Sequence, residues 1–245
     1  ELPATPLSFD GVGSAQAITG QPVGKWQYFV FNVPATNALG WDLRMTNVTS
    51  GDPRLVICRD RLPYDLSSHN YAGGYWYAYA DNAWPSGNSW GASYDWTSYY
   101  YDPGSLNYYG KLLAMGRGNP LEPGTYYVGV NSGSGTTPLG YTLVSRGIGT
   151  NLSIPVLDLP FAGGTAWSNN LPAREAAYYR VQIASNTPSW KLRLAVTNGE
   201  AMLLIQKDCL PNVAGGSGVS TTLGGGRTLQ KSGDEQYLLM PDNTA

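Results

Sequence analysis

The sequence predicts an all-β protein on three grounds. The 245 residues include 31 glycines and 17 prolines, which favour turns and are poor helix formers. Charged residues make up only 13% of the chain, fewer than globular proteins usually carry. Apolar residues recur at every second position over short runs, which is the period of a half-buried strand. We therefore expect short strands joined by many turns.

The first predicted strands lie close together along the chain. Residues 29–33 alternate between apolar and less apolar side chains, and Pro34 ends this run. Residues 41–45 alternate in the same way, and a continuous apolar run follows at 55–58. The Gly-Asp-Pro sequence at 51–53 supplies a turn between these two strands.

The same order of elements recurs about 149 residues later in the chain. Apolar residues alternate over 179–183, and strand-like runs follow at 190–194 and 203–205. The motif Trp-x-Leu-Arg begins at Trp41 and again at Trp190. The motif Asp-x-Leu-Pro begins at Asp60 and at Asp208, which lie at equivalent places in the two copies.

This repeat predicts two tandem domains. A first β-sandwich module covers residues 1–149, a second covers 150–245, and a short linker near 146–155 brings them into contact. In the second copy, Asn198 and Gly199 separate two strand-like runs. Both residue types tolerate the positive φ of a type I′ turn, so we expect a β-hairpin there.

The second copy is shorter than the first. The first copy closes with strand-like runs at 111–115, 124–130 and 141–144. The second copy reaches a counterpart of the 111–115 run at 236–240 and has nothing equivalent to the last two. An unfinished sheet edge carries unpaired backbone N–H and C=O groups, so the missing strands must be replaced or covered. We expect this polypeptide to be a fragment of a larger protein.

The closing part of the first copy carries a family resemblance. Residues 123–130 read Pro-Gly-Thr-Tyr-Tyr-Val-Gly-Val, and 140–143 read Gly-Tyr-Thr-Leu. With the aromatic-led strand at 29–33 and Trp-x-Leu-x-Met at 41–45, this pattern resembles the bacterial pre-peptidase C-terminal domain family, which is related to collagen-binding domains. The resemblance implies jelly-roll-like antiparallel β-sandwiches that serve as accessory parts of secreted peptidases and other exported enzymes.

Some members of that family bind calcium through acidic residues near strand ends, and Asp52, Asp60 and Asp65 occupy comparable turns. Calcium needs six or more oxygen ligands, and no ligand loop of fixed spacing is present. The alternative is that these carboxylates cap turns or face solvent. Cys58 and Cys209, the two cysteines of the chain, either form a disulfide or remain buried thiols.

An aromatic-rich insert interrupts the first copy at about 64–109. It holds four tryptophans and eleven tyrosines, where the second copy has mainly Gly, Ser, Thr and Leu. One core can hardly bury so many rings, so some should be exposed. The insert forms a self-packed cap, a platform for carbohydrate or another polymer, or a protein-docking surface. The candidate ligand-binding residues are Trp76, Trp84, Trp90, Trp96, Tyr99 and Tyr100, with Asp95 and Asp102 as polar partners.

The sequence argues against catalysis. His69 is the one histidine of the chain, and no Gly-x-Ser-x-Gly motif accompanies it, so a Ser-His-Asp triad is not expected. Ligands at zinc spacing are likewise missing. A glycosidase needs only two carboxylates, and Asp95 with Asp102 or Glu122 would be the pair to examine. We expect a non-catalytic module, with this one enzymatic alternative left open.

Charge and hydropathy limit the expected partners. The formal net charge is −2 and no run of Lys or Arg occurs, so neither nucleic acid nor an anionic membrane surface is an expected partner. The apolar runs are too short for membrane insertion. We expect a secreted, extracellular or cell-surface module that binds an extracellular polymer, with polysaccharide favoured. The rival expectation is a structural spacer, an assembly or adhesion unit, or a binder of collagen-like protein.

Overall fold

The computed structural model describes residues 3–11, 15–51, 53–63, 70–71, 78–80, 99–102, 107–116, 120–131, 136–172, 175–211, 227–229 and 235–239. Within these residues there are seventeen strands and no helix, so the all-β prediction is confirmed. That part of the chain accordingly contains no helix able to span a membrane.

The first sheet is built around β10 (Gly124–Asn131), which pairs antiparallel with β3 (Gln27–Val33) on one side and β5 (Arg54–Arg59) on the other. Val128 of β10 lies opposite Phe29 of β3 and opposite Ile57 of β5. The strand order is β1 (Ala4–Pro6), β3 (Gln27–Val33), β10 (Gly124–Asn131), β5 (Arg54–Arg59), β7 (Ala78–Ala80) and β6 (Asn70–Tyr71).

The second sheet is built around two long strands, β4 and β11, which pair antiparallel. It continues from β11 into the second half of the chain. The strand order is β13 (Tyr178–Arg180), β12 (Ile154–Asp158), β11 (Leu139–Gly149), β4 (Ala38–Ser50), β9 (Asn107–Met115) and β8 (Tyr99–Asp102), with β2 (Gln16–Gln21) also paired to β11.

Both sheets are mixed, whereas the expected jelly-roll-like sandwich is antiparallel. The parallel pairs are β1 with β3, β5 with β7, β11 with β12, and β12 with β13. Each of these pairs includes a short strand at or near the edge of its sheet, added to the antiparallel centre. The alternation of side chains predicts strands, but it does not fix the direction in which an edge strand runs.

The core lies between these two sheets, and it confirms the inward faces of the strands expected at 29–33 and 41–45. Phe29 and Phe31 come from the first sheet, and Trp41 and Leu43 come from the second. All four are completely buried. The Trp41 ring packs at 5.1 Å from that of Phe31 and at 5.4 Å from that of Tyr126, measured between centroids. Burying one large apolar side chain contributes about 1.5–3 kcal/mol to stability.

The second half also contains two separate small sheets, each of two strands. They pair β14 (Trp190–Leu194) with β17 (Glu235–Leu239), and β15 (Leu203–Ile205) with β16 (Arg227–Leu229). The hairpin expected at Asn198 and Gly199 is wrong, because β14 and β15 on either side of this turn belong to different sheets. Of the two turn residues only Gly199 has a positive φ, at 80°, which also differs from a type I′ turn.

Strand pairs in the two halves correspond to each other. β1 runs parallel to β3, with Leu7 N–H donating to Val30 O at 2.9 Å. β12 runs parallel to β13 in the same way, with Leu159 N–H donating to Arg180 O at 2.9 Å. The strand β4 pairs with β9 as β14 pairs with β17, with Trp41 opposite Met115 and Trp190 opposite Leu239, the last residues of β9 and β17.

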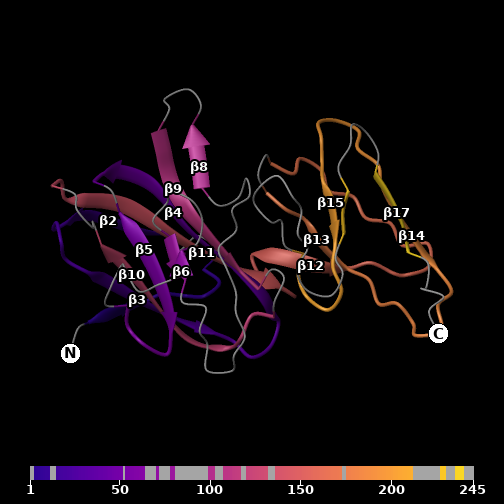
Figure 1. Cartoon of the computed structure of the whole chain (residues 1–245), viewed down its shortest axis with the longest axis horizontal. Helices are drawn as coiled ribbons and strands as arrows, with labels where there is room; N and C mark the ends of the chain where they lie inside the picture. The colour runs from indigo at the N-terminus through magenta and orange to yellow at the C-terminus, as the bar shows by residue number, and fades with distance from the viewer. Residues whose placement is uncertain are drawn as a thin grey trace.

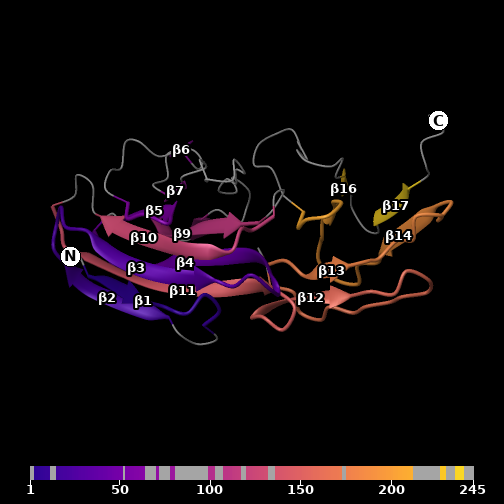
Figure 2. The same cartoon turned by 90° about the horizontal axis from the view of Figure 1, so that it is seen from below.

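The expected counterpart of 111–115 is therefore shifted by one residue. Trp41 lies opposite Met115, the last residue of the run 111–115. Trp190 lies opposite Leu239 and not opposite Met240, the last residue of the expected counterpart 236–240. The chain is elongated: the first sheet and the strands β2, β4, β8, β9 and β11 of the second lie at one end, β12 and β13 in the middle, and β14, β15 and β17 at the other end (Figure 1). Figure 2 shows the strands of the first half as stacked layers, with β12 continuing beyond them.

Candidate functional site

The junction between the two halves contains a network of polar contacts. β12 begins beside the end of β11, with Ile148 opposite Ile154 and Gly149 opposite Pro155. Parallel neighbours usually need a crossover of about a dozen residues or more. Here the four residues 150–153 are enough to connect β11 to β12, because the two strands overlap only at these two residue pairs. The rest of β12 extends the sheet beyond the end of β11.

A single carboxylate holds this step in place. Asp10 Oδ1 accepts hydrogen bonds from Gly147 N at 2.8 Å and from Ser153 N at 3.1 Å. Its Oδ2 also accepts from Ser153 N, at 3.0 Å. The step requires glycine at position 149, because a Cβ atom there would lie 1.7 Å from the carbonyl oxygen of Asn37. Asp10 thus ties the end of β11 to the start of β12.

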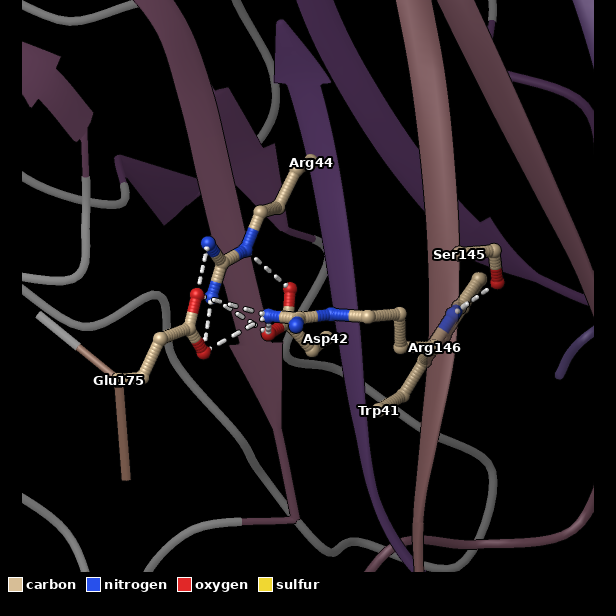
Figure 3. A network of polar contacts seen from close by, with 6 residues as sticks. All are labelled: Trp41, Asp42, Arg44, Ser145, Arg146 and Glu175. Carbon is tan, nitrogen blue, oxygen red and sulfur yellow. Dashed lines mark hydrogen bonds and ion pairs between the residues drawn. The ribbon is translucent and has the colours of Figure 1, made fainter. Parts of the chain in front are cut away.

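A cluster of four charged side chains lies on the outer face of the second sheet, beside this step (Figure 3). Trp41 and Leu43 of β4 enter the core, so the alternation of the strand turns Asp42 and Arg44 to the opposite face. Arg146 of β11 lies directly across from Asp42 in the strand pairing. The fourth member, Glu175, comes from the segment that precedes β13, so it belongs to the second half of the chain.

The two arginines hold both carboxylates. Arg44 binds Asp42 through two hydrogen bonds of 2.9 Å, from Nε to Oδ1 and from Nη2 to Oδ2. Arg146 Nη2 donates to Asp42 Oδ2 at 2.5 Å and to Glu175 Oε2 at 3.1 Å. Arg44 Nη1 donates to Glu175 Oε1 at 2.7 Å. Bidentate pairs of this kind are both strong and directional.

The electrostatics of this cluster are balanced, because two guanidinium groups face two carboxylates. The Asp42 side chain is only 3% exposed, and the other three are each about one quarter exposed. Burial by itself would lower the pKa of Arg44, but the hydrogen bonds and charges of Asp42 and Glu175 outweigh it, so this pKa lies above its ordinary value. Each carboxylate is held by both arginines, which suits the cluster for holding two segments together.

Buried contacts continue from the cluster into the core. Trp41 Nε1 donates to Ser145 Oγ at 2.8 Å, and Ser145 Oγ donates to the carbonyl of Phe9 at 2.6 Å. Close by, a second small apolar cluster joins the halves. It consists of Ile148 from β11, Val156 from β12, Tyr178 from β13 and Leu210.

Most of the ligand-binding candidates fall outside the described residues. This is so for Trp76, Trp84, Trp90, Trp96 and Asp95. Tyr99, Tyr100 and Asp102 lie in β8, whose backbone pairs with β9 at the edge of the second sheet. The described strands of the insert extend both sheets: β7 and β6 follow β5 in the first sheet, and β8 follows β9 in the second. β7 and β9 are in contact, so these additions lie on the same side of the core.

The acidic candidates are placed only in part. Asp60 is exposed, has a φ of 59°, and lies 3.6 Å from Arg59 Nε through its Oδ2. Glu122 is 8% exposed, and its Oε2 accepts a hydrogen bond of 2.5 Å from Arg59 Nη1. Within the described ranges no group of three or more His, Cys, Asp or Glu side chains is close enough to hold a metal ion. Asp52, Asp65 and His69 lie outside those ranges.

The two cysteines are free in the structure, so the disulfide alternative is not realised. Cys58 lies in β5, in the middle of the first sheet, and is completely buried. Burial raises the pKa of its thiol to about 11, although the charge of Arg61 lowers it. Cys209 lies in the turn after β15 and accepts a hydrogen bond from Gln206 Nε2 at 3.2 Å. The two residues do not hold equivalent places, because Cys209 corresponds to Arg61 in the Asp-x-Leu-Pro motif, whereas Cys58 lies two residues before that motif.

The charged cluster was not among the sites predicted from the sequence. Its visible signal was the alternation of Asp42 and Arg44 with the core residues Trp41 and Leu43, which turns a charge pair toward the outer face. The second copy of the motif has Lys191 where the first has Asp42, and this difference marks the position as specific to the first half.

Comparison with protein-family models, with curated proteins and with solved structures gives no match for this chain. The resemblance to the pre-peptidase C-terminal domain family therefore stays a prediction.

Proposed function

We propose that the chain is a non-catalytic binding part of a secreted, extracellular bacterial protein, and that its aromatic insert holds an extracellular polymer, with polysaccharide favoured. The observation that carries this proposal is the place of the insert. Its described strands extend both sheets on one side of the core, and the segment 64–109 to which they belong has fifteen aromatic residues.

The chemistry of the insert suits a polymer of sugars. Tryptophan and tyrosine combine a large apolar ring face with a polar edge, and they lose little conformational entropy on binding. Carboxylates accept hydrogen bonds from sugar hydroxyls. The proposed binding residues are the rings of Trp76, Trp84, Trp90, Trp96, Tyr99 and Tyr100, with Asp95 and Asp102 as hydrogen-bond acceptors.

The proposal includes two tandem, related β-sandwiches of the jelly-roll-like kind found in the pre-peptidase C-terminal domain family. The corresponding pairs β1–β3 and β12–β13, and β4–β9 and β14–β17, support this relation between the halves. The proposed family relation makes the chain an accessory part of a larger exported protein.

The test is retention on insoluble cellulose, chitin and collagen in a pull-down assay. The variant W84A/W90A/W96A should lose at least about 90% of the retention on its polysaccharide, because stacking rings supply much of the contact. The matched control is Trp167→Ala, since Trp167 is 79% exposed and lies outside the insert. Unchanged retention of the triple variant, or loss only in the control, contradicts the proposal. Retention on collagen alone would identify a protein ligand.

A second candidate function is a structural spacer or assembly unit. The observation that favours it is the junction, where a continuous sheet and the Asp42–Arg44–Arg146–Glu175 cluster fix the two halves to each other. A spacer needs such stiffness, whereas a polymer platform does not. If the intact chain binds none of the three polymers, while small-angle scattering shows a rigid elongated particle, this candidate is favoured.

A further inference from the structure

The turn between β14 and β15 contains a dipeptide that the fold leaves uncovered. Asn198 and Gly199 lie in this turn, and residues 197–200 are all exposed. A Cβ atom placed on Gly199 would meet no atom of the described chain within 4 Å. The strands β14 and β15 pair with β17 and β16, in two different sheets, so the two sides of the turn are not joined to each other by a strand pairing. The backbone of this turn is therefore less restrained than that of a hairpin.

An asparagine that precedes a glycine places two reactive groups close together. A bond between the Gly199 nitrogen and the side-chain carbon Cγ of Asn198 would close a five-membered ring, so little motion is needed to bring the two atoms into contact. The nitrogen must lose its proton before it can act as a nucleophile. A side chain on the following residue would hinder its approach, and glycine has none. The reaction thus requires an N–H group that is open to solvent and a flexible, unhindered backbone.

Both requirements are met in this turn. Within the described residues, the structure contains no hydrogen bond from the Gly199 N–H and none to the side-chain amide of Asn198. The φ of Gly199 is 80°, a conformation that glycine adopts at little cost. Solvent base can therefore reach the nitrogen, and no contact holds the side chain away from it.

A comparable dipeptide in the first half is protected. The sequence contains one Asn-Gly pair, at 198–199, and one Asp-Gly pair, at 10–11. The Asp10 carboxylate accepts hydrogen bonds from Gly147 N and Ser153 N, and the Gly11 N–H donates to Ser145 O at 3.3 Å. Both groups that would have to react at 10–11 are thus held in hydrogen bonds, whereas those at 198–199 are not.

We propose that Asn198 is a site of spontaneous deamidation in the folded protein. The deprotonated Gly199 nitrogen attacks Cγ of Asn198, and the new C–N bond closes a succinimide ring while Nδ2 takes up a proton and leaves as ammonia. Water then opens the ring at either carbonyl, which produces aspartate or isoaspartate at position 198. The reaction is neither an oxidation nor a reduction, and water is its only co-reactant. This inference goes beyond polymer binding and does not depend on it.

The product changes the charge and the length of the turn. Replacing the amide by a carboxylate lowers the formal net charge by one unit and places the new charge near the exposed Glu200. In isoaspartate the main chain passes through the former side chain, so the connection between β14 and β15 gains one carbon atom. The first half makes no printed contact with this turn, so its folding is expected to stay unchanged.

The test follows the full chain during incubation in neutral buffer, with proteolytic digestion and mass spectrometry at intervals. The peptide that contains Asn198 should gain the mass expected when NH2 is replaced by OH, and it should separate into aspartate and isoaspartate forms. Asn151 and Asn186 are also exposed, but leucine and threonine follow them, so Asn198 should react at least about tenfold faster than either. The rate should rise with pH, because the attacking nitrogen must lose its proton.

Two variants sharpen this test. Asn198→Gln should abolish the fast reaction, because the longer side chain would have to close a larger ring. Asp10→Asn places a second Asn-Gly pair at the protected position. In the folded chain it should react at least about tenfold more slowly than Asn198, and in urea, where both pairs are exposed, the two should react at similar rates. Hydrogen exchange in β3 reports whether this variant stays folded, and if it does not, the comparison with Asn151 and Asn186 decides alone.

Two outcomes would overturn the proposal. One is that Asn198 reacts no faster than Asn151 and Asn186 in the folded chain. The other is that the asparagine of a folded Asp10→Asn variant reacts as fast as Asn198, which would mean that the fold gives no protection. Retention on polysaccharide should be the same for Asn198→Asp as for the unmodified chain, because the turn lies outside the insert. Failure here is therefore distinct from failure of the polymer-binding proposal.

Discussion

Phe29 and Tyr179 hold corresponding places in strands of the same pattern, and each strand has the same parallel neighbour on one side. Phe29 is completely buried, but Tyr179 is 39% exposed. The same contrast holds for the tryptophans that begin the Trp-x-Leu-Arg motifs, because Trp41 is completely buried and Trp190 is only partly so. A strand pattern specifies which side chains can enter a core, whereas neighbouring strands decide whether that core is closed.

In the first half, β10 and β11 close the two sheets around the core. β10 pairs with both β3 and β5, and β11 pairs with β4. The described second half has β12, β13, β14 and β17 in corresponding places but no pair that closes over them. The first half should therefore carry most of the stability of the chain, and each of the following experiments tests this difference.

The largest expected effect is the loss of the Trp41 side chain. Trp41→Ala should lower the free energy of unfolding by about 3–5 kcal/mol, because it removes a buried ring and leaves a cavity between the sheets. Trp190→Ala is the matched variant in the second half and should cost less than half as much. Equilibrium unfolding in urea measures both values. Equal losses would mean that the second core is as closed as the first.

The next largest effect concerns the charged cluster. Asp42→Ala removes the nearly buried carboxylate and leaves Arg44 and Arg146 facing each other, so the free energy of unfolding should fall by about 3 kcal/mol. Lys191→Ala, at the corresponding exposed position of the second half, should change it by less than about 0.5 kcal/mol.

From the contacts of the cluster we expect local unfolding to begin in the second half when Asp42 is lost. In Asp42→Ala, hydrogen exchange should quicken in β12 and β13 before it does in β3, because Glu175 then loses an ordered pair of arginine donors. Unchanged exchange in the second half would show that Glu175 does not fix it to the first.

A smaller effect arises at alkaline pH. Burial raises the pKa of Tyr126 and Tyr141 above the ordinary value; at Tyr126 the charge of Arg59 opposes this, and those of Glu122 and Asp60 add to it. The folded state therefore favours the neutral hydroxyls, and their contribution is complete below about pH 10, the ordinary tyrosine pKa. It is lost as the pH rises through the higher pKa of the folded state.

Unfolding measured across this range should show stability falling above about pH 10. In Y126F/Y141F the fall should be shallower, at the cost of about 1 kcal/mol per lost hydroxyl bond, which Tyr126 donates to Glu122 O and Tyr141 to Gln21 Oε1. An identical fall in the double variant would rule out these hydroxyls as its source.

The smallest effect is one of reactivity alone. A thiol reagent at about pH 8 should modify Cys209 readily and Cys58 only after unfolding, since Cys58 is completely buried and burial raises its thiol pKa to about 11. Counting modified sites by mass spectrometry distinguishes them. Two equally fast sites would mean that β5 opens in the native state, and no reaction without a reductant would indicate a disulfide.

Sequence patterns predicted a strand well where one of its faces enters the core and the other does not. The runs 29–33 and 41–45 are such strands, because their apolar side chains alternate as the burial between the two sheets does. Strand direction was not predictable, since parallel and antiparallel neighbours place side chains with the same period. The hairpin at Asn198 and Gly199 failed for a related reason: local turn preference favours a hairpin, but the flanking strands join different sheets.

The candidate sites were less predictable than the strands. Glu175 lies far along the chain from Arg44, and only the fold of the junction brings their side chains together. Acidic residues such as Glu122 gave no sign in the sequence of being tied to an arginine, as Glu122 is to Arg59. The aromatic insert was identified by composition, which does not determine which of its rings face a ligand.

The step from β11 to β12 has a mechanical consequence. Both strands run in the same direction and overlap at two residue pairs, so tension applied between the halves acts along the strands and loads their hydrogen bonds in shear. Asp10 clamps both sides of the step, and the arginine–carboxylate cluster resists sideways bending. A force applied to one half should therefore be transmitted to the other through these strands and hydrogen bonds.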